Sequence, residues 1–291
     1  MKAEVIASIQ TLRDRLSSSH ASGTSIGLVP TMGALHQGHG RLIEQARREC
    51  GTVVVSVFVN PLQFDRKDDL DRYPRTLDAD VEVCSSLGAD IVFAPTVAEM
   101  YPTPPMCVVE VGRMGDHLCG RHRPGHFRGM ATVVLKLLQI AQPDRAYFGE
   151  KDAQQLAIIR RMVLDLNVPS TIVGVPTVRE PDGLAMSSRN RHLSPEARQS
   201  ATALYRALLD AERQILAGAT DAKAIVSEAL TQIPAESGLK VEYLEVVDPD
   251  DLQPVERVAG PVLVAGAVWA GATRLIDNIL CQPKKVGLKP A

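Results

Sequence analysis

The chain has 291 residues, of which 45% are hydrophobic and 23% are charged. These fractions are typical of globular proteins, and they exclude a disordered chain or a small disulfide-stabilised protein. With 32 basic and 34 acidic side chains the formal net charge is -2, so no overall positive field favours binding to nucleic acid or to an anionic membrane.

Three features indicate where the protein works. The five cysteines form no C-x-x-C pair, and an odd number without regular spacing argues against a disulfide framework. Residues 1–16 show the apolar spacing of a helix and not the continuous apolar core of a signal peptide. The longest apolar stretches, at 53–59 and 262–272, are shorter than the roughly 20 residues that span a bilayer. We therefore expect a cytoplasmic protein that does not enter a membrane.

Short apolar, β-branched runs alternate with helical periods in the first part of the chain. This alternation is typical of βαβ units around a buried parallel sheet. We therefore predict a Rossmann-like α/β domain with flanking helices over residues 1–177. The predicted strands are 25–29, 52–59, 90–93, 145–148 and 171–175, and the predicted helices between them are 41–50, 76–87, 127–140 and 153–167.

A charged, glycine-containing segment that begins at Thr177 interrupts this alternation, and we place the domain boundary there. Ser194 followed by Pro195 favours a helix start, because the hydroxyl can cap a free N–H and proline needs none at the first helical position. The remaining pattern predicts a smaller C-terminal α+β domain over residues 178–291 with an antiparallel sheet. Its expected elements are a helix to 216, a helix from 221, and strands at 240–246, 262–269 and 273–279.

The first predicted strand leads through the segment PTMGALHQGHG, residues 30–40, into a helix. At a strand–turn–helix junction the free N–H groups of the helix favour binding of an anion such as phosphate. His36 and His39 are spaced to point from one face of a turn, and Gly38 leaves room for a ligand near the backbone. The sequence contains neither the G-x-G-x-x-G nor the G-x-x-x-x-G-K-[ST] motif, which argues against dehydrogenases and P-loop kinases.

Two later segments also suit phosphate. Lys151 follows the predicted strand 145–148 and therefore lies at the same sheet edge. Ser187, Ser188 and Arg189 place two hydroxyls and a guanidinium in the connecting segment, which suits a loop that closes over a triphosphate. Each segment alone has a plain interpretation as a solvated helix face or polar linker, but the three together favour a nucleotide site.

The H-x-G-H pattern resembles that of the nucleotidylyltransferase-like superfamily, which includes class I aminoacyl-tRNA synthetases and small adenylyl and cytidylyl transferases. The size and charge of the chain argue against a tRNA synthetase, since no basic surface for RNA is evident. A transferase and a nucleotide-binding protein without turnover remain alternatives. A zinc site is disfavoured because its candidate ligands lack a paired spacing. Those candidates are Cys107, His117, Cys119, His122 and His126.

Six ordered segments resemble one family closely, the pantothenate synthetases or pantoate:beta-alanine ligases. They are PTMGALHQGH, FVNPLQF, DLDRYPRT, RPGHFRG, FGEKDAQQL and DGLAMSSRN, and they extend over essentially the whole chain. The resemblance implies that the enzyme joins pantoate to beta-alanine with ATP and Mg2+. It also implies a pantoyl-adenylate intermediate, release of AMP and pyrophosphate, and a homodimer, for which we expect apolar strands such as 53–59 to contribute.

The same resemblance assigns roles to individual residues. The catalytic set that it implies is His36, His39, Lys151, Ser187, Ser188 and Arg189. The pantoate site that it implies comprises Gln63, Gln155, Asn60, Met32 and Pro30, with Phe58 in its apolar wall. The ATP site that it implies comprises Met32, His39, Gly149, Lys151, Asp152, Val178, Met186, Ser187 and Arg189. Asp80 is the candidate Mg2+ ligand, although the neighbouring position, often acidic in the family, is Ala79 here. Residues 123–128 are expected to form a basic lip beside the site.

Overall fold

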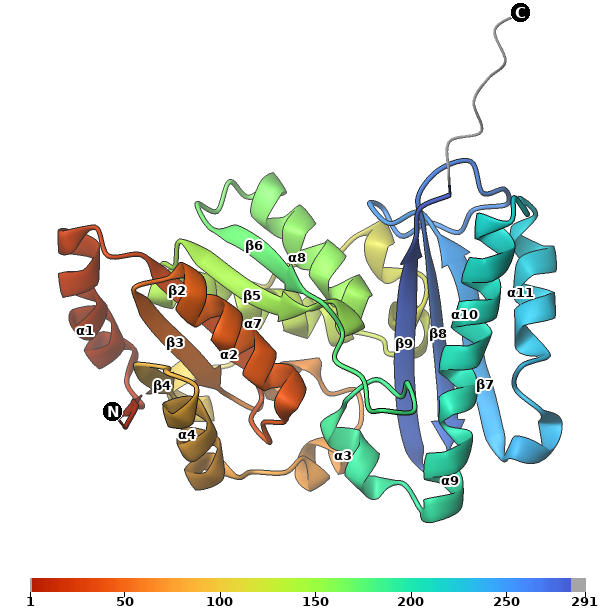
Figure 1. Cartoon of the computed structure of the whole chain (residues 1–291). Coiled ribbons are helices and arrows are strands. Elements are labelled where there is room, and N and C mark those ends of the chain that lie inside the picture. Colours follow the sequence, from red (N-terminus) through yellow and green to blue (C-terminus); the bar gives the residue numbers. More distant parts are fainter. Residues whose placement is uncertain (1, 284–291) are drawn as a thin grey trace, which may run out of the picture. The chain divides into compact units, whose positions relative to one another are not determined.

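A computed structural model describes residues 2–283 and divides them into two compact units (Figure 1). Unit 1 comprises residues 2–112 and 122–178, and unit 2 comprises residues 113–121 and 179–283. The segment 113–121, which the sequence placed in the first domain, therefore belongs to unit 2. A sequence pattern does not reveal that this segment belongs to unit 2, because the segment contains no regular strand or long helix.

Unit 1 is built on a parallel sheet of six strands, which confirms the predicted Rossmann-like fold. The strands are β1 (Glu4–Ile6), β2 (Ile26–Thr31), β3 (Thr52–Val57), β4 (Ile91–Phe93), β5 (Arg145–Gly149) and β6 (Thr171–Val175). They are arranged in the order β1-β4-β3-β2-β5-β6. The inner strands are continuous apolar runs because helices cover the sheet on both faces.

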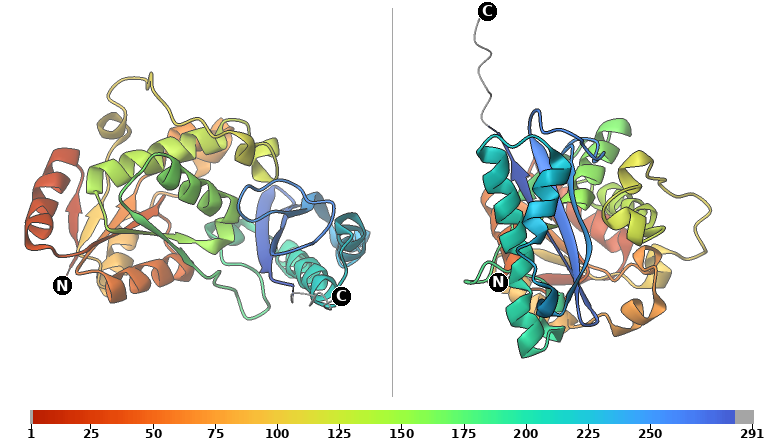
Figure 2. Two further views of the ribbon diagram at one scale, coloured as in Figure 1. Left: turned by 90° about the horizontal axis from the view of Figure 1, so that it is seen from above. Right: turned by 90° about the vertical axis from the view of Figure 1, so that its right-hand side faces the viewer.

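Helices flank the sheet on both sides, as the view from above shows (Figure 2). The helices α2 (Gln37–Glu49) and α4 (Leu77–Ser86) share one apolar core with the strands. The other layer contains α1 (Ile9–Ser22), α7 (His126–Ala141) and α8 (Ala153–Asp165), with α7 in contact with both of the others. Two short helices, α3 (Lys67–Arg72) and α5 (Val97–Met100), lie in the connections.

The N-terminal residues differ from the prediction. Val5 belongs to strand β1, where it pairs with Val92 of β4, and helix α1 begins only at Ile9. Ser8 caps this helix by accepting a hydrogen bond from the Thr11 backbone N–H. Apolar residues at 5 and 6 fit a helical period by chance, and the pairing with β4 overrides it. Val53–Val55 of the segment 53–59 are fully buried between β2 and β4, so these three residues offer no surface to a second chain, and the dimer itself stays a prediction.

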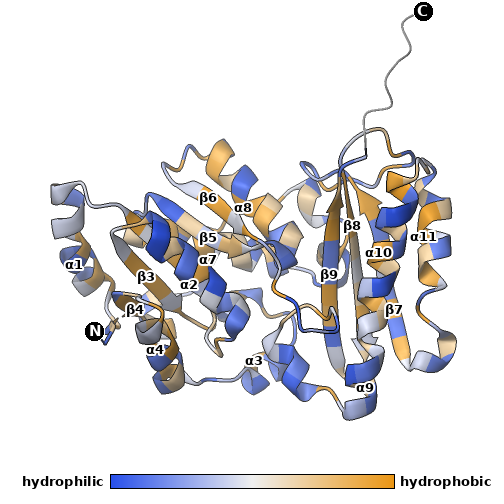
Figure 3. Ribbon diagram, viewed as in Figure 1, coloured by the Kyte–Doolittle hydropathy of each residue, from blue (hydrophilic) through white to orange (hydrophobic). Residues whose placement is uncertain are grey.

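Unit 2 confirms the predicted antiparallel sheet. Its strands are β7 (Leu239–Val247), β8 (Val262–Ala270) and β9 (Thr273–Cys281), in the order β7-β8-β9. The apolar residues of β8 stand out in the hydropathy colouring, and they share a core with α10 (Thr202–Leu216) and α11 (Ala222–Leu230) (Figure 3). The helix predicted to start at Ser194 is divided into α9 (Pro195–Ser200) and α10.

The segment 113–121 is held on unit 2 by side-chain contacts. The Cys119 thiol lies 3.1 Å from the Tyr243 hydroxyl, and Arg121 forms an ion pair of 3.1 Å with Glu245. The short helix α6 (Cys119–His122) begins here. None of the helices formed by residues 2–283 has the length and apolar character needed to cross a lipid bilayer.

Candidate active site

The strand order of unit 1 reverses at β2, which has β3 and β4 on one side and β5 and β6 on the other. Strands β2 and β5 pair only at Gly27 with Arg145 and Leu28 with Ala146, so their pairing stops before their carboxyl ends. Helix α2 leaves β2 on one face of the sheet and α8 follows β5 on the other. Ligands of open α/β sheets bind at such a reversal of strand order.

The loop between β2 and α2 is held by a buried carboxylate. Asp80 of α4 accepts hydrogen bonds from the backbone N–H groups of Ala34 at 3.1 Å and Leu35 at 2.8 Å. The Thr76 hydroxyl donates a third hydrogen bond. A side chain at Gly33 would lie 2.9 Å from the Asp80 carboxylate, and both Gly33 and Ala34 have positive φ angles. These contacts fit a loop anchor, and the Mg2+ contact at Asp80 stays a prediction.

The two histidines are oriented by the helix that they begin. His36 is the N-cap of α2, and its Nδ1 accepts a hydrogen bond from the Gly38 N–H at 3.1 Å. Nδ1 of His39 accepts from the His36 N–H at 3.3 Å, and the ring centroids lie 4.1 Å apart. Since both Nδ1 atoms are acceptors, a neutral ring carries its proton on Nε2. Both histidines therefore present an Nε2–H donor.

Electrostatics keep His39 neutral. Burial, followed by the neighbouring His36, lowers the pKa of His39 from its usual 6.5 to about 3. The charge of Asp152 raises this pKa and that of Lys151 lowers it, so the segment after β5 lies within electrostatic reach of His39. Lys151 and Asp152 belong to the 3-10 helix η3 (Glu150–Asp152), and their charged groups are 3.7 Å apart. The structure thus brings the predicted histidine pair and lysine to one sheet edge.

The predicted amides emerge beside them from the end of β3. Asn60 caps the 3-10 helix η1 (Pro61–Gln63), Gln63 is its last residue, and both are buried. The Gln63 amide donates to the Met32 sulfur at 3.1 Å and accepts from the Asn60 amide at 3.1 Å. Asn60 also accepts from the Tyr101 hydroxyl at 2.9 Å, a contact that the sequence did not suggest.

The other predicted residues divide between the two units. Gln155 lies in α8 and is partly buried. Phe58 is buried after β3 and lies 6.1 Å from the Tyr101 ring, centroid to centroid. Pro30 lies near the end of β2, Gly149 ends β5, and Val178 is the last residue of unit 1. Met186, Ser187, Ser188 and Arg189 belong to unit 2.

In unit 2 the predicted phosphate loop follows a well-anchored hairpin. Arg179 at its base forms a bidentate ion pair with the buried Asp277 and stacks 3.8 Å from the centre of the Tyr205 ring. The Ser187 hydroxyl caps the 3-10 helix η4 (Ser188–His192) by accepting from the Arg189 N–H at 3.3 Å. The loop conformation is thus fixed within unit 2 itself.

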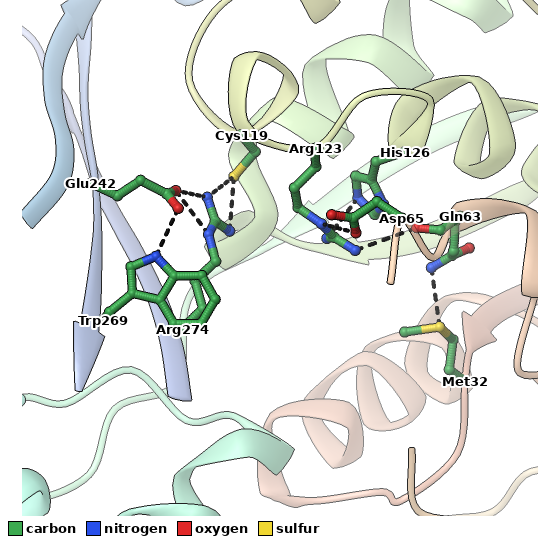
Figure 4. Close-up of polar contacts among 9 residues, drawn as sticks. All are labelled: Met32, Gln63, Asp65, Cys119, Arg123, His126, Glu242, Trp269 and Arg274. Carbon is green, nitrogen blue, oxygen red and sulfur yellow. Dashed lines mark hydrogen bonds and ion pairs between the residues drawn. The ribbon is translucent and has the colours of Figure 1, made fainter. Parts of the chain in front are cut away.

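The candidate zinc ligands serve other contacts. His126 contacts Gln63 and Arg123 in unit 1, and Cys119 contacts Arg274 in unit 2 (Figure 4). Cys119 also contacts Tyr243. Among residues 2–283 no group of three or more histidine, cysteine or acidic side chains is arranged to hold a metal.

Comparison with known proteins identifies the family. The model of the pantoate-beta-alanine ligase family matches residues 4–280. The chain belongs to this family. It is 49% identical to the pantothenate synthetase of Moorella thermoacetica, over 96% of this chain and 99% of that one. It is 54% identical to the bifunctional pantoate ligase/cytidylate kinase of Thermosynechococcus vestitus over 90% of its length, but spans only 52% of that longer protein.

Solved structures agree with the sequence comparison. Pantothenate synthetase from Thermus thermophilus superposes with a TM-score of 0.89 at 46% identity, over 96% of this chain and all of that one. The pantoate-beta-alanine ligase of Francisella tularensis, in a complex with beta-gamma ATP and beta-alanine, gives a TM-score of 0.79 at 35% identity, over 96% and 97% of the two chains. These matches favour a ligase of pantothenate biosynthesis over the transferase and tRNA synthetase alternatives.

The contacts of Asp80 lead to a stability prediction. In Asp80→Asn the side-chain NH2 group replaces one of the two oxygens that accept from the loop backbone. One backbone N–H of the loop then faces a donor and loses its acceptor, which should lower the free energy of unfolding by about 1–3 kcal/mol. Hydrogen exchange at the Ala34 and Leu35 amides should become about tenfold faster. Asp78→Asn is the matched control, because Asp78 is exposed on the same helix. Equal exchange rates in the two variants would contradict this assignment.

The low histidine pKa values predict a pH dependence of stability. Burial and Arg123 lower the pKa of His126 to about 4, and Asp65 and Asp152 oppose this effect. Between pH 6.5 and about 4.5 the unfolded chain binds more protons at His39 and His126, so the free energy of unfolding falls as the pH decreases. We expect a loss of about 1–2 kcal/mol per pH unit, after allowance for partial exposure.

Urea unfolding at several pH values measures this slope. His39→Gln should reduce the slope by about half, since one of the two titrating groups is removed. His20→Gln, at an exposed position of α1, should leave it unchanged. A slope in His39→Gln equal to that of the unmodified chain would show that His39 is not the source.

Proposed function

We propose that the chain condenses pantoate with beta-alanine in an ATP-dependent reaction that passes through pantoyl-adenylate and releases AMP and pyrophosphate. The observation that carries this proposal is that His36 and His39, with ring centroids 4.1 Å apart, lie at the strand reversal of unit 1 and that Lys151 is within electrostatic reach of His39. The similar Francisella protein, whose complex contains beta-gamma ATP and beta-alanine, supports the same choice of substrates.

The first step is an attack of a pantoate carboxylate oxygen on the α-phosphorus of ATP. The new O–P bond forms as the bond to the bridging oxygen breaks, and pyrophosphate leaves with the electron pair. Two like charges 4 Å apart repel by about 4 kcal/mol at an effective dielectric constant near 20. His36, His39 and Lys151 would offset this repulsion by donating to the phosphate oxygens. No general base is needed, because the carboxylate is already ionised near pH 7.

Binding of pantoate and of the nucleotide is proposed for unit 1. Gln63 and Gln155 would hold the polar groups of pantoate, and Pro30, Met32 and Phe58 would contact its methyl groups. Asp152 suits a ribose hydroxyl, because its carboxylate can accept a hydrogen bond. By the resemblance, Ser187, Ser188 and Arg189 would donate to the phosphates that leave as pyrophosphate, and Gly149, Val178 and Met186 would contact the adenosine.

Mg2+ is proposed to accompany ATP. Magnesium in nucleotide sites commonly keeps water and phosphate oxygens as most of its ligands. Asp80 remains the one candidate protein ligand from the sequence, but its oxygens already accept hydrogen bonds from the Ala34 and Leu35 backbone. We therefore assign no step of the reaction to a metal bound at Asp80.

In the second step the amine of beta-alanine attacks the acyl carbon of the adenylate. The ammonium group first loses one proton to solvent and becomes a nucleophile. The C–N bond then forms, the acyl C–O bond breaks with its electron pair leaving on AMP, and the nitrogen releases a second proton to solvent. The protein would hold the adenylate still during this step, since correct placement of two reactants alone accelerates their reaction by orders of magnitude.

An isotope experiment tests the adenylate route. Pantoate labelled with 18O in its carboxylate should transfer one 18O atom to the phosphate of AMP, which mass spectrometry detects. His36→Ala and Lys151→Ala should each lower the rate of AMP formation by about 100-fold or more while the fold persists. AMP without label would exclude the adenylate, and normal rates in both variants would contradict the roles of these residues.

We also propose that the enzyme is a cytoplasmic homodimer. All five cysteines are free thiols, which suits a reducing compartment. We propose that Met106, whose side chain is 98% exposed, contacts the partner subunit. Sedimentation should give twice the 31.5 kDa mass of one chain, and Met106→Glu should shift the protein toward that single mass. A single-chain mass at micromolar concentration would refute the dimer.

A further inference from the structure

The backbone carbonyl of Gln63 is bound by two side chains that lie at the start of helix α7 and just before it (Figure 4). Its carbonyl oxygen accepts a hydrogen bond from His126 Nδ1 at 2.7 Å and another from Arg123 Nη2 at 3.3 Å. Both donors come from residues 123–128, the segment that the sequence assigned to a basic lip. These two side chains therefore contact a residue of the proposed pantoate site and do not simply face solvent.

The protonation state of His126 is set by its two neighbours. Nδ1 must carry the proton, because its partner is a carbonyl oxygen. Nε2 lies 3.3 Å from Arg123 Nη1, and since a guanidinium can only donate, this nitrogen is the acceptor. Burial, and then the charge of Arg123, lower the pKa of the ring, so the neutral form is the one present near pH 7.

Arg123 contacts Asp65 in addition to Gln63 and His126. Its Nε donates to Asp65 at 3.2 Å, and the two side chains are only 16% and 22% exposed. Asp65 is two residues beyond Gln63, so Arg123 holds the chain at both positions. Because the pair is partly buried and is also hydrogen-bonded to His126, it fixes geometry better than an isolated surface ion pair does.

The same region of α7 touches η1 directly. A Cβ atom at Gly129 would lie 2.0 Å from the Leu62 carbonyl oxygen, so only glycine allows this approach. The Gly129 carbonyl accepts a hydrogen bond from Asn60 at 3.1 Å. The backbone on either side of Gln63 is thus held against one helix, and the direction of its side chain toward Met32 follows from that placement.

We propose that Arg123 and His126 are positioning residues, which fix the Gln63 carbonyl and thereby direct the Gln63 amide toward the carboxylic acid substrate. This inference rests on the proposed function, in which Gln63 binds pantoate. A displacement of about 1 Å in a substrate-binding group can lower a rate by as much as about 100-fold. The contacts of Arg123 and His126 with Gln63 are called the clamp below. Loss of the clamp should therefore lower kcat/KM for pantoate and leave ATP binding unchanged.

Two substitutions of His126 that both introduce an amide distinguish a positioning role of this residue from a packing role. The amide of His126→Asn lies near the former Nδ1 position and can still donate to the Gln63 carbonyl. The amide of His126→Gln lies near the former Nε2 position and cannot. We expect kcat/KM for pantoate within about threefold of the unmodified enzyme for His126→Asn, and a loss of about 10–30-fold for His126→Gln. The KM for ATP should change by less than about twofold in both.

A double-mutant cycle tests whether the effect passes through Gln63. In a Gln63→Ala background, His126→Gln should cause no further loss in kcat/KM for pantoate, because the group that it positions is gone. Additive losses would show that His126 acts on the substrate independently and would overturn the proposal. Equal losses in His126→Asn and His126→Gln would also overturn it.

A substitution at a different residue tests the proposal if the His126 variants fail to fold. Asp65→Asn weakens the ion pair to Arg123 at a partly exposed position and should raise the KM for pantoate by about three- to fivefold. An unchanged KM would contradict the clamp. If the unmodified enzyme forms no pantothenate, the proposed function fails, whereas normal turnover with unaffected variants refutes the clamp alone.

Discussion

The Asp80 carboxylate is the constraint on which the rest of the site depends. It binds the N–H groups of Ala34 and Leu35 and so determines where the chain turns from β2 into α2. The two residues that follow this turn begin the helix and carry its first histidine. Because a buried polar group is costly unless it is hydrogen-bonded, the Asp80 side chain and the loop stabilise each other. The position of the first histidine is therefore set by contacts within unit 1.

Three histidines of unit 1 owe their proton positions to backbone groups. Nδ1 of His36 and of His39 accepts from an N–H, whereas Nδ1 of His126 donates to a carbonyl. The first two rings, when neutral, thus carry their proton on Nε2, and the third turns its Nε2 toward Arg123. Burial keeps His39 and His126 neutral, so these rings orient groups and donate hydrogen bonds without adding charge.

The sequence predicted the parallel sheet and the antiparallel sheet because both depend on local periodicity. It also predicted the meeting of His36, His39 and Lys151, since residues after parallel strands share one edge. It did not predict strand β1, the anchor at Asp80, or the contacts of His126. Each of these is a pairing between residues distant in the chain, such as Val5 with Val92, and a single sequence has no signal for such pairs. Tyr101 was missed for the same reason.

Residues 113–121 belong to unit 2 although the chain on both sides of them belongs to unit 1, and this limits how the protein can be divided into fragments. The chain passes between the units after residues 112, 121 and 178, so a single cut cannot yield two intact pieces. A fragment ending at 177 would carry Cys119 and Arg121 without Tyr243 and Glu245, the groups that they contact. It would leave β7 without the loop that covers these residues. Expression of either half alone is thus a poor route to a working module, because each cut separates residues that belong to the same compact unit.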